Sequence, residues 1–229
     1  MSLVCLIPAR GGSKGIPNKN KKLFCGKPLI QWTIECALSS KKIDRTIVST
    51  DDPEIAEISK QNGAEVPFLR PPKLALDNSP TVETVIHCLE NIQNVNSLLL
   101  LQATSPLRTE EDIEGILAMQ RKHSADSIVS INKVSEHPSY MFNLNLGNKL
   151  SPFIEEDLPY RRQDLEEIYI LNGAMYFIKV DLLIKEKKLI NSSSLGYIMP
   201  LERSIDIDTQ DDWNLAEYIM KKKLKTPKF

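Results

Sequence analysis

The sequence lacks an excess of charge of either sign. It contains 29 basic and 30 acidic residues, which gives a formal net charge of -1 at pH 7. A general nucleic-acid-binding domain carries a marked basic excess, so this balance argues against nucleic acid as a partner. Any binding of phosphate groups must therefore depend on a local cluster of cations.

The sequence also has few cysteines and histidines, and it has no long hydrophobic run. The 4 cysteines form no CxxC pair and only 3 histidines accompany them, so neither a disulfide framework nor a structural zinc site is indicated. No apolar run reaches membrane-spanning length, and the apolar start is too short for a signal peptide. We therefore expect a soluble, cytoplasmic protein with reduced thiols and no membrane partner.

What the sequence does contain is a regular alternation of apolar, strand-like runs and amphipathic, helix-like runs. With 229 residues, of which 41% are hydrophobic, the chain can bury one sizeable core, so we predict a single domain over 1–229. The alternation predicts an open α/β sheet, mostly parallel, with helices on both faces. The runs are strand-like at 3–8, 45–50, 97–102 and 127–132, and helix-like at 27–40, 52–63, 81–92 and 110–123.

The alternation breaks between about Val134 and Ile168, where prolines and clustered charges mix with short strand-like pieces. We expect an inserted arm or a lid in this segment. Regular structure resumes over 172–186, with a further strand near 196–200 and a strand that leads into a helix over 204–225.

A glycine-rich basic loop, "PARGGSKGIPNKN", directly follows the first strand-like run. Ligands of open α/β sheets bind outside the carboxyl ends of strands, which is where this loop lies. The loop matches neither the GxGxxG dinucleotide motif nor the P-loop. Gly11 and Gly12 let backbone amides approach an anion, and Arg10, Lys14 and Lys19 supply positive charge suited to a triphosphate. A solvated basic turn is the alternative interpretation.

Paired carboxylates near the end of the chain, in "SIDIDTQDD", give the clearest chemical signal. On an extended strand, residues two apart point to the same side, so Asp206 and Asp208 would face one point while Ile205 and Ile207 face the core. Two carboxylate oxygens suit Mg²⁺, which fills its other positions with water and substrate phosphates. The alternative is that one Asp caps the following helix.

Polar residues also follow the most apolar strand-like run, in "LQATSPLR". Gln102, Thr104 and Ser105 would emerge at the carboxyl edge of the sheet, which makes Gln102 a candidate for contact with a nucleotide or a sugar. Arg108 could be a ligand or a charge at the start of the next helix, and we prefer the helix position.

Six motifs together resemble the acylneuraminate cytidylyltransferases: "PARGGSKGIPNKN", "VSTDD", "FLRPPKLALDNSPT", "LQATSPLR", "NGAMY" and "SIDIDTQDD". They span almost the whole chain. The resemblance implies a Rossmann-like nucleotide-diphospho-sugar transferase fold, with a mostly parallel mixed sheet flanked by helices. It implies transfer of CMP from CTP to a sialic acid with release of pyrophosphate, with Mg²⁺ as cofactor. It also implies that about 134–168 is a dimerisation arm, and hence a homodimer.

The resemblance assigns roles to individual residues on the nucleotide side. It makes the phosphate ligands and their neighbours Arg10, Gly11, Lys14, Lys19 and Asn20. It places Arg70 and the Asp77 to Thr81 turn, including Ser79 and Thr81, near the cytosine, with Gln102 close by. Arg10 and Lys19 would stabilise the departing pyrophosphate, and Asp208 is a candidate base for the sugar hydroxyl as well as a metal ligand.

On the acceptor side, the resemblance implies contacts from Gln102, Tyr140, Arg162, Asn172 and Tyr176. Arg162 aligns with an arginine that faces the sugar carboxylate, and a shift by one residue would give that role to Arg161. Some sialic-acid members have Arg where Ile170 stands and Lys where Tyr140 stands. These departures leave open a related ulosonate of legionaminic, pseudaminic or Kdo type as the acceptor.

Two other function classes compete with this enzyme. A regulator that binds CTP without turning it over would keep the same fold. An NAD-dependent dehydrogenase is disfavoured because GxGxxG is missing.

Overall fold

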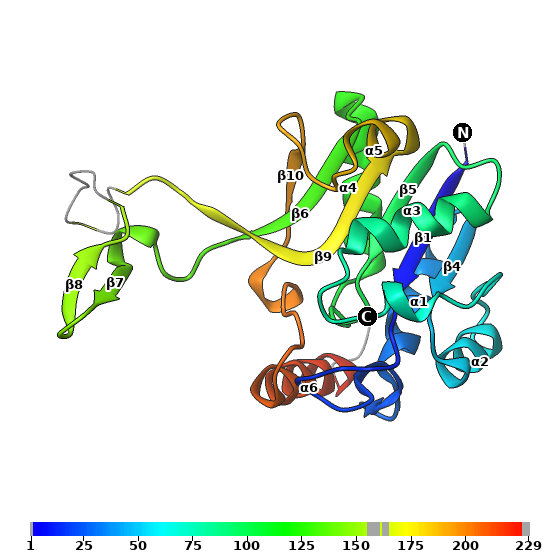
Figure 1. Cartoon of the computed structure of the whole chain (residues 1–229), viewed down its shortest axis with the longest axis horizontal. Coiled ribbons are helices and arrows are strands. Elements are labelled where there is room, and N and C mark those ends of the chain that lie inside the picture. The colour runs from blue at the N-terminus through cyan, green and yellow to red at the C-terminus, as the bar shows by residue number, and fades with distance from the viewer. Residues whose placement is uncertain (1, 155–160, 162–164, 226–229) are drawn as a thin grey trace.

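The computed structural model describes residues 2–154, 161 and 165–225, and it is built on a six-stranded sheet (Figure 1). The strand order is β10-β6-β9-β5-β1-β4. β9 runs antiparallel to both of its neighbours, and the remaining pairs are parallel. The predicted mostly parallel mixed sheet is therefore confirmed. The strands are β1 (Leu3–Pro8), β4 (Arg45–Ser49), β5 (Ser97–Leu101), β6 (Ser127–Lys133), β9 (Tyr169–Lys179) and β10 (Leu195–Ile198).

Helices cover both faces of the sheet, as the alternating pattern predicts. Alternate residues of β1 enter two different cores: Cys5 and Ile7 pack with α1, α2 and α4, whereas Val4 and Leu6 pack with α3 and α5. The helices are α1 (Leu29–Ser39), α2 (Pro53–Gln61), α3 (Thr81–Asn91), α4 (Glu110–His123), α5 (Val180–Glu186) and α6 (Gln210–Lys225). Short 3-10 turns lie at η1 (Lys19–Lys21), η2 (Pro72–Leu74), η3 (Pro138–Tyr140) and η5 (Leu201–Arg203).

A third core joins the two ends of the chain. α6 packs against the segment that follows β1, which includes the small hairpin of β2 (Leu23–Phe24) and β3 (Lys27–Pro28). Phe24 meets Trp213 edge-on, with ring centroids 5.2 Å apart. Figure 1 shows α6, in red, beside the blue segment that follows β1. This packing brings the glycine-rich loop close to residues 204–212, the acidic segment.

The acidic segment is held from its other side by a buried ion pair. Arg203 of η5 binds both carboxylate oxygens of Asp112, each at 2.8 Å. Asp112 lies in the first turn of α4, is 0% exposed, and also accepts a hydrogen bond from the Thr109 amide at 2.9 Å. The residues that follow Arg203 are therefore fixed relative to α4.

The prediction of a strand over 204–208 is wrong. The segment belongs to none of the sheets, and its Ile207 amide donates one hydrogen bond to the Thr104 carbonyl at 2.9 Å. A single bond to a loop does not make a strand ladder. The expected alternation survives without it, because Ile207 is buried while Asp206 and Asp208 are exposed.

The segment that breaks the alternation carries a separate hairpin, formed by β7 (Phe142–Asn145) and β8 (Lys149–Pro152). Figure 1 shows this hairpin standing well away from the body of the molecule, at the far end of two long connections from β6 and β9. Its geometry is that of an arm rather than a lid over the chain's own sheet. It exposes apolar side chains at Tyr140, Met141, Phe142, Leu144, Leu146, Leu150 and Phe153.

The four cysteines are free thiols, and two of them, Cys5 and Cys88, are buried. Within the described part of the chain, no helix combines the length and the apolar character needed to cross a bilayer.

Candidate active site

A cavity of about 310 Å³ opens at the carboxyl ends of β1 and β5. It gathers side chains from the start, the middle and the end of the chain. Its lining includes Pro8, Arg10, Gly12, Ser13, Lys19, Asn20, Arg70, Leu74, Leu76, Asp77, Ser79, Thr81, Thr84, Gln102, Thr104, Asp206 and Asp208. Most of the residues that the sequence predicts for nucleotide and metal binding therefore share one cavity.

The glycine-rich loop is fastened to the end of β4. The Gly11 amide donates to Asp51 Oδ1 at 3.0 Å, and a side chain at Gly11 would bring its Cβ within 2.8 Å of Asp52 Cβ. Asn20 donates to the Arg10 carbonyl at 2.9 Å and so closes the loop on itself. Gly12, rather than Gly11, lines the cavity, and the Gly11 amide that we expected near an anion is engaged by Asp51.

Asp51 and Asp52 received no role from the sequence, although "VSTDD" contains them. Asp52 caps α2 by accepting hydrogen bonds from the amides of Glu54 and Ile55, and it pairs with Lys21 at 3.0 Å. Although burial raises the pKa of Asp52, these hydrogen bonds outweigh it and lower the pKa below its ordinary value. Two carboxylates directly after a strand beside β1 are the signal that could have identified this anchor.

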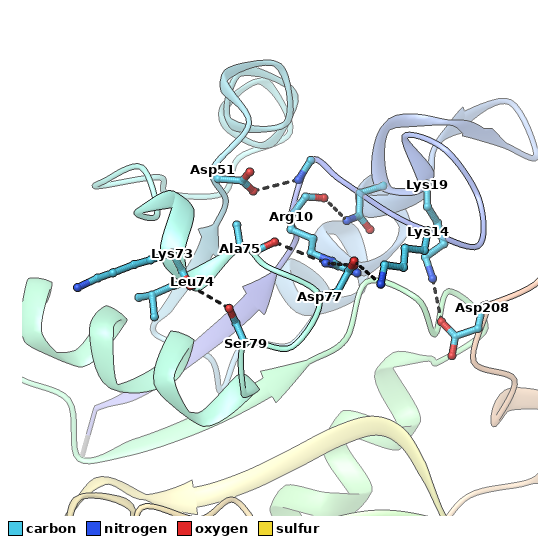
Figure 2. A network of polar contacts seen from close by, with 12 residues as sticks. Arg10, Lys14, Lys19, Asp51, Lys73, Leu74, Ala75, Asp77, Ser79 and Asp208 are labelled. Carbon is cyan, nitrogen blue, oxygen red and sulfur yellow. Dashed lines mark hydrogen bonds and ion pairs between the residues drawn. The ribbon is translucent and has the colours of Figure 1, made fainter.

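The three cations of the loop divide between two partners (Figure 2). Arg10 Nη1 lies 2.5 Å from Asp77 Oδ1, and Lys14 Nζ lies 2.8 Å from Asp77 Oδ2. Lys19 points the other way, where its ammonium donates to the Ile207 carbonyl and lies 3.0 Å from Asp208 Oδ1. The Lys14 side chain is 80% exposed and does not line the cavity. The sequence led us to expect three cations around a single point. In the structure they point to two different carboxylates, so this expectation is wrong.

The acidic segment faces the cavity with both carboxylates. Desolvation by the surrounding protein raises the pKa of Asp206, and the charge of Asp208 raises it further against a hydrogen bond from Thr104. Gly15 makes the close approach of the two loops possible, because a Cβ there would lie 2.0 Å from the Asp208 carbonyl oxygen. Two neighbouring carboxylates, of which Asp206 is partly desolvated, favour a bound cation.

The helix-capping alternative for these carboxylates is wrong. Thr209 precedes α6, and its hydroxyl accepts a hydrogen bond from the Asp212 amide at 3.2 Å. The Asp212 carboxylate in turn accepts from the Thr209 and Asp208 amides at 2.7 and 3.1 Å. In this reciprocal cap the capping carboxylate is that of Asp212, and neither Asp206 nor Asp208 caps the helix through its side chain.

A donor set of two carboxylates fits Mg²⁺. Over residues 2–154, 161 and 165–225, no group of three or more His, Cys, Asp or Glu side chains is arranged to hold a metal. A metal in the cavity would therefore rely on Asp206 and Asp208, and Mg²⁺ typically uses one or two protein carboxylates together with water and phosphate oxygens.

The loop opposite the glycines is held by a buried arginine. Arg70 donates to the hydroxyl of Ser49 at 3.1 Å and to its carbonyl, and it reaches the Leu74 carbonyl at 3.4 Å. Burial lowers the pKa of Arg70 to about 10. Ser79 in the same loop donates to the Lys73 carbonyl at 2.9 Å, and Thr81 begins α3. Arg70, Ser79 and Thr81 all line the cavity. Arg70 and Ser79 also hold the loop in shape through their bonds to the carbonyls of Leu74 and Lys73.

Comparison with known proteins identifies the family. The family model described as Cytidylyltransferase matches residues 4–204. The chain belongs to the cytidylyltransferase family. This confirms the resemblance found in the sequence motifs.

Named relatives of the chain differ in length and in printed substrate. The N-acylneuraminate cytidylyltransferase of Streptococcus agalactiae is 35% identical over 93% of the chain, which spans only 52% of that protein. The CMP-N,N'-diacetyllegionaminic acid synthase of Legionella pneumophila is 38% identical over 96% of the chain and 97% of the relative. The pseudaminic acid cytidylyltransferase of Campylobacter jejuni is 32% identical over the same shares. The chain thus spans about half the length of some curated relatives and nearly all of others.

Solved structures support the fold. A CMP:2-keto-3-deoxy-manno-octonic acid synthetase complexed with CTP superposes with a TM-score of 0.72 at 19% identity, over 97% of this chain and 100% of that one. A 4-diphosphocytidyl-2C-methyl-D-erythritol synthase from Anaerococcus prevotii gives a TM-score of 0.65 at 12% identity, over 96% and 98%. At these identities the likeness is one of fold.

Arg108 lies directly before the N-cap of α4, but it is more than the charge at the start of the helix that we preferred. Its guanidinium is buried and donates to the Ala174 carbonyl at 2.7 Å and to the Thr33 hydroxyl at 3.1 Å. It also reaches the Gln102 carbonyl at 3.4 Å. Arg108 therefore ties the end of β5 to β9 behind Gln102, which itself lines the cavity.

The residues predicted to contact the acceptor do not gather in this cavity, apart from Gln102. Asn172 is buried, where its Oδ1 accepts from the Ser130 hydroxyl at 2.6 Å and its Nδ2 donates to the Ser204 hydroxyl at 3.0 Å. Tyr176 packs against the core around α3, and burial raises its pKa.

The remaining acceptor predictions fall on the arm. Tyr140 lies in η3 at the base of the hairpin and is 46% exposed. Arg161 is exposed, and Arg162 lies outside the described residues. The cavity of one chain therefore holds the predicted nucleotide and metal residues far more completely than the predicted acceptor residues.

Proposed function

We propose that this chain transfers CMP from CTP to the anomeric hydroxyl of an acylneuraminate, with release of pyrophosphate. The observation that carries the proposal is the single cavity in which the basic glycine-rich loop faces a pair of carboxylates. A basic loop alone would suit any phosphate, whereas a basic loop opposite a metal-binding pair suits nucleotidyl transfer. The printed names of the relatives agree on a nonulosonic acid as the acceptor class.

A related sugar is the second candidate for the acceptor. The Legionella pneumophila relative, named for N,N'-diacetyllegionaminic acid, matches nearly its full length at 38% identity. Ile170, which is 54% exposed, and Tyr140 stand where some sialic-acid members have basic residues. The same chemistry would then run on a legionaminic or pseudaminic acid.

In the proposed reaction, the protein binds and orients the triphosphate between two walls. Arg10 and Lys14 bind phosphate oxygens and stabilise the departing pyrophosphate by charge-assisted hydrogen bonds. Asp206 and Asp208 would hold Mg²⁺, which would supply positive charge to the phosphate oxygens. The Lys19 ammonium occupies Asp208 Oδ1 and so fixes this carboxylate against the glycine-rich loop.

The sugar hydroxyl attacks the α-phosphorus in line, and its proton must pass to a base. Asp208 is the candidate base, with Oδ1 engaged by Lys19 and Oδ2 left for the metal or the hydroxyl. Gln102, which lines the cavity at the carboxyl end of β5, would contact either the nucleotide or the sugar.

The arm supports the proposal of a homodimer. Apolar side chains such as Phe142, Leu144 and Leu150 are exposed along the hairpin in a single chain, and a second copy would cover them. We propose that such a pairing would also bring Tyr140 of one chain toward the cavity of the other. We further propose a cytoplasmic location, supported by four free thiols.

An acceptor panel tests the proposal. Purified protein is given CTP and Mg²⁺ with N-acetylneuraminate, legionaminic, pseudaminic or Kdo-type acid, and pyrophosphate release is measured. The proposal predicts release that needs both CTP and one of the nonulosonic acids. CTP binding without release across the whole panel would instead favour the regulator.

A further inference from the structure

Asp77 places a carboxylate between two cations of the candidate phosphate loop. Its two oxygens are used separately, Oδ1 by Arg10 at 2.5 Å and Oδ2 by Lys14 at 2.8 Å. Figure 2 shows both side chains converging on this one carboxylate. Hydrogen bonds from Lys14 and then from Arg10 lower the pKa of Asp77, so the group is ionised at neutral pH.

Asp77 belongs to the wall opposite the glycines. It lies in the loop between Arg70 and α3, and this loop also carries Ser79 on the cavity surface. Arg10 donates a second, longer hydrogen bond to the Ala75 carbonyl at 3.5 Å, so the two loops meet at neighbouring points. The root of the loop has its own attachment, since Arg70 reaches the Leu74 carbonyl. The contacts of Asp77 and Ala75 therefore hold residues 75–79 of the cavity wall against Arg10 and Lys14.

We propose that Asp77 occupies the place of a phosphate group at Arg10 and Lys14, and that a nucleotide must displace it in order to bind. This inference rests on the proposed function, since it takes the ligand of the two cations to be the phosphates of CTP. A carboxylate brings one negative charge to two cations, whereas a triphosphate brings several, so the phosphates win the exchange. When pyrophosphate leaves, Asp77 returns and pairs the two cations again.

The exchange has a measurable consequence for affinity. A ligand that can bind only when Asp77 has moved shows an apparent Kd raised by the reciprocal of the displaced fraction. Asp77 thus weakens the binding of the anionic part of the nucleotide and leaves the binding of the nucleoside part unchanged. It also couples the two walls, because bound phosphates favour the state in which Asp77 no longer ties the loop that carries Ser79 to the glycine-rich loop.

Asp77→Asn tests the proposal, with Asp126→Asn as the matched control. Asp126 forms a comparable exposed ion pair, 2.5 Å from Lys179, and it is not part of the cavity lining. Both variants lose one negative charge. Pyrophosphate and CTP are titrated by calorimetry in metal-free buffer, and cytidine binding is followed by saturation-transfer NMR. We expect Asp77→Asn to bind pyrophosphate and CTP with a Kd roughly three- to tenfold lower than wild type, the size expected for two exposed ion pairs.

The controls separate displacement from other roles of Asp77. Asp126→Asn should bind all three ligands with the wild-type Kd, and Asp77→Asn should bind cytidine with the wild-type Kd. Asp77→Glu keeps the carboxylate, so its Kd values for pyrophosphate and CTP should lie close to those of wild type. Equal or weaker binding of pyrophosphate by Asp77→Asn would overturn the proposal. Weaker binding of cytidine and CTP with no gain for pyrophosphate would also overturn it and give Asp77 a role in shaping the base-binding wall. Failure of wild type itself to bind CTP when Mg²⁺ is also supplied would overturn the proposed function as well.

Discussion

Lys19 and Asp208 are 189 positions apart in the chain, and their side chains form an ion pair of 3.0 Å beside the cavity. The same ammonium donates to the Ile207 carbonyl, and the Lys19 side chain is only 9% exposed. One side chain therefore joins the glycine-rich loop to the acidic segment. The geometry of the candidate metal site depends on this link as much as on the carboxylates themselves.

Replacing Lys19 by Met should damage both stability and activity. The Ile207 carbonyl would lose its buried partner, which costs about 1–3 kcal/mol in the free energy of unfolding. Urea denaturation and pyrophosphate release measure the two effects. Lys41→Met, at an exposed turn outside the cavity lining, is the control and should leave both unchanged. Wild-type stability in Lys19→Met would show that the link does not hold the segment.

Gly15→Ala should displace the two loops from each other. The new Cβ would lie 2.0 Å from the Asp208 carbonyl oxygen, so backbone atoms must move. We expect a loss of about 1–3 kcal/mol in unfolding free energy, typical of overpacking, and at least about a tenfold loss of activity. Gly12→Ala is the matched control for stability, because no atom lies within 4 Å of its Cβ position. Equal stability of the two variants would refute the close contact.

The fold of the sheet is predictable from sequence because its signals are local. Apolar runs such as 97–101 and the amphipathic run at 110–123 need only their own periodicity to be recognised. The segment 204–208 has the same alternation but pairs with no strand, since pairing depends on what lies beside it. A period of two therefore predicts which side chains face the cavity and does not predict a ladder.

The partners of the charged side chains are less predictable. Lys14 and Lys19 look equivalent in the loop, yet one pairs with Asp77 and the other with Asp208. The choice depends on two other loops that only the folded chain brings near. Arg108 is a similar case, because its buried guanidinium donates to one carbonyl of β9, that of Ala174, which lies 66 positions away.

Arg203→Met should be strongly destabilising, because it leaves the fully buried Asp112 carboxylate without its cation. Breaking a buried pair in this way costs about 3–5 kcal/mol. Urea unfolding of Arg203→Met, Asp112→Asn and the double variant forms the test. The double variant should lose less unfolding free energy than the two single variants lose together. Additive losses of unfolding free energy would argue against a coupled pair.

Stability at low pH should depend on Asp52. The pKa of this carboxyl is lowered in the folded protein, so its contribution is fully present above the unfolded pKa of about 4 and is lost as the pH falls through the lower folded value. Asp52→Asn keeps a capping side chain without the ionisation. Urea unfolding between pH 7 and pH 3 should show that the difference in unfolding free energy between wild type and Asp52→Asn becomes smaller in acid. A gap that stays constant with pH would contradict this role.

Phosphorus NMR of the reaction mixture tests the central claim most directly. With CTP, Mg²⁺ and the acceptor identified by the panel, the account predicts a new phosphodiester resonance that grows in step with pyrophosphate. Asp206→Asn and Asp208→Asn should each slow the growth of this resonance by at least about a hundredfold while CTP still binds. The reason is that the charge on the transferring phosphate is no longer offset. A CTP spectrum that stays unchanged, or hydrolysis to CMP and pyrophosphate without a sugar adduct, would contradict the account.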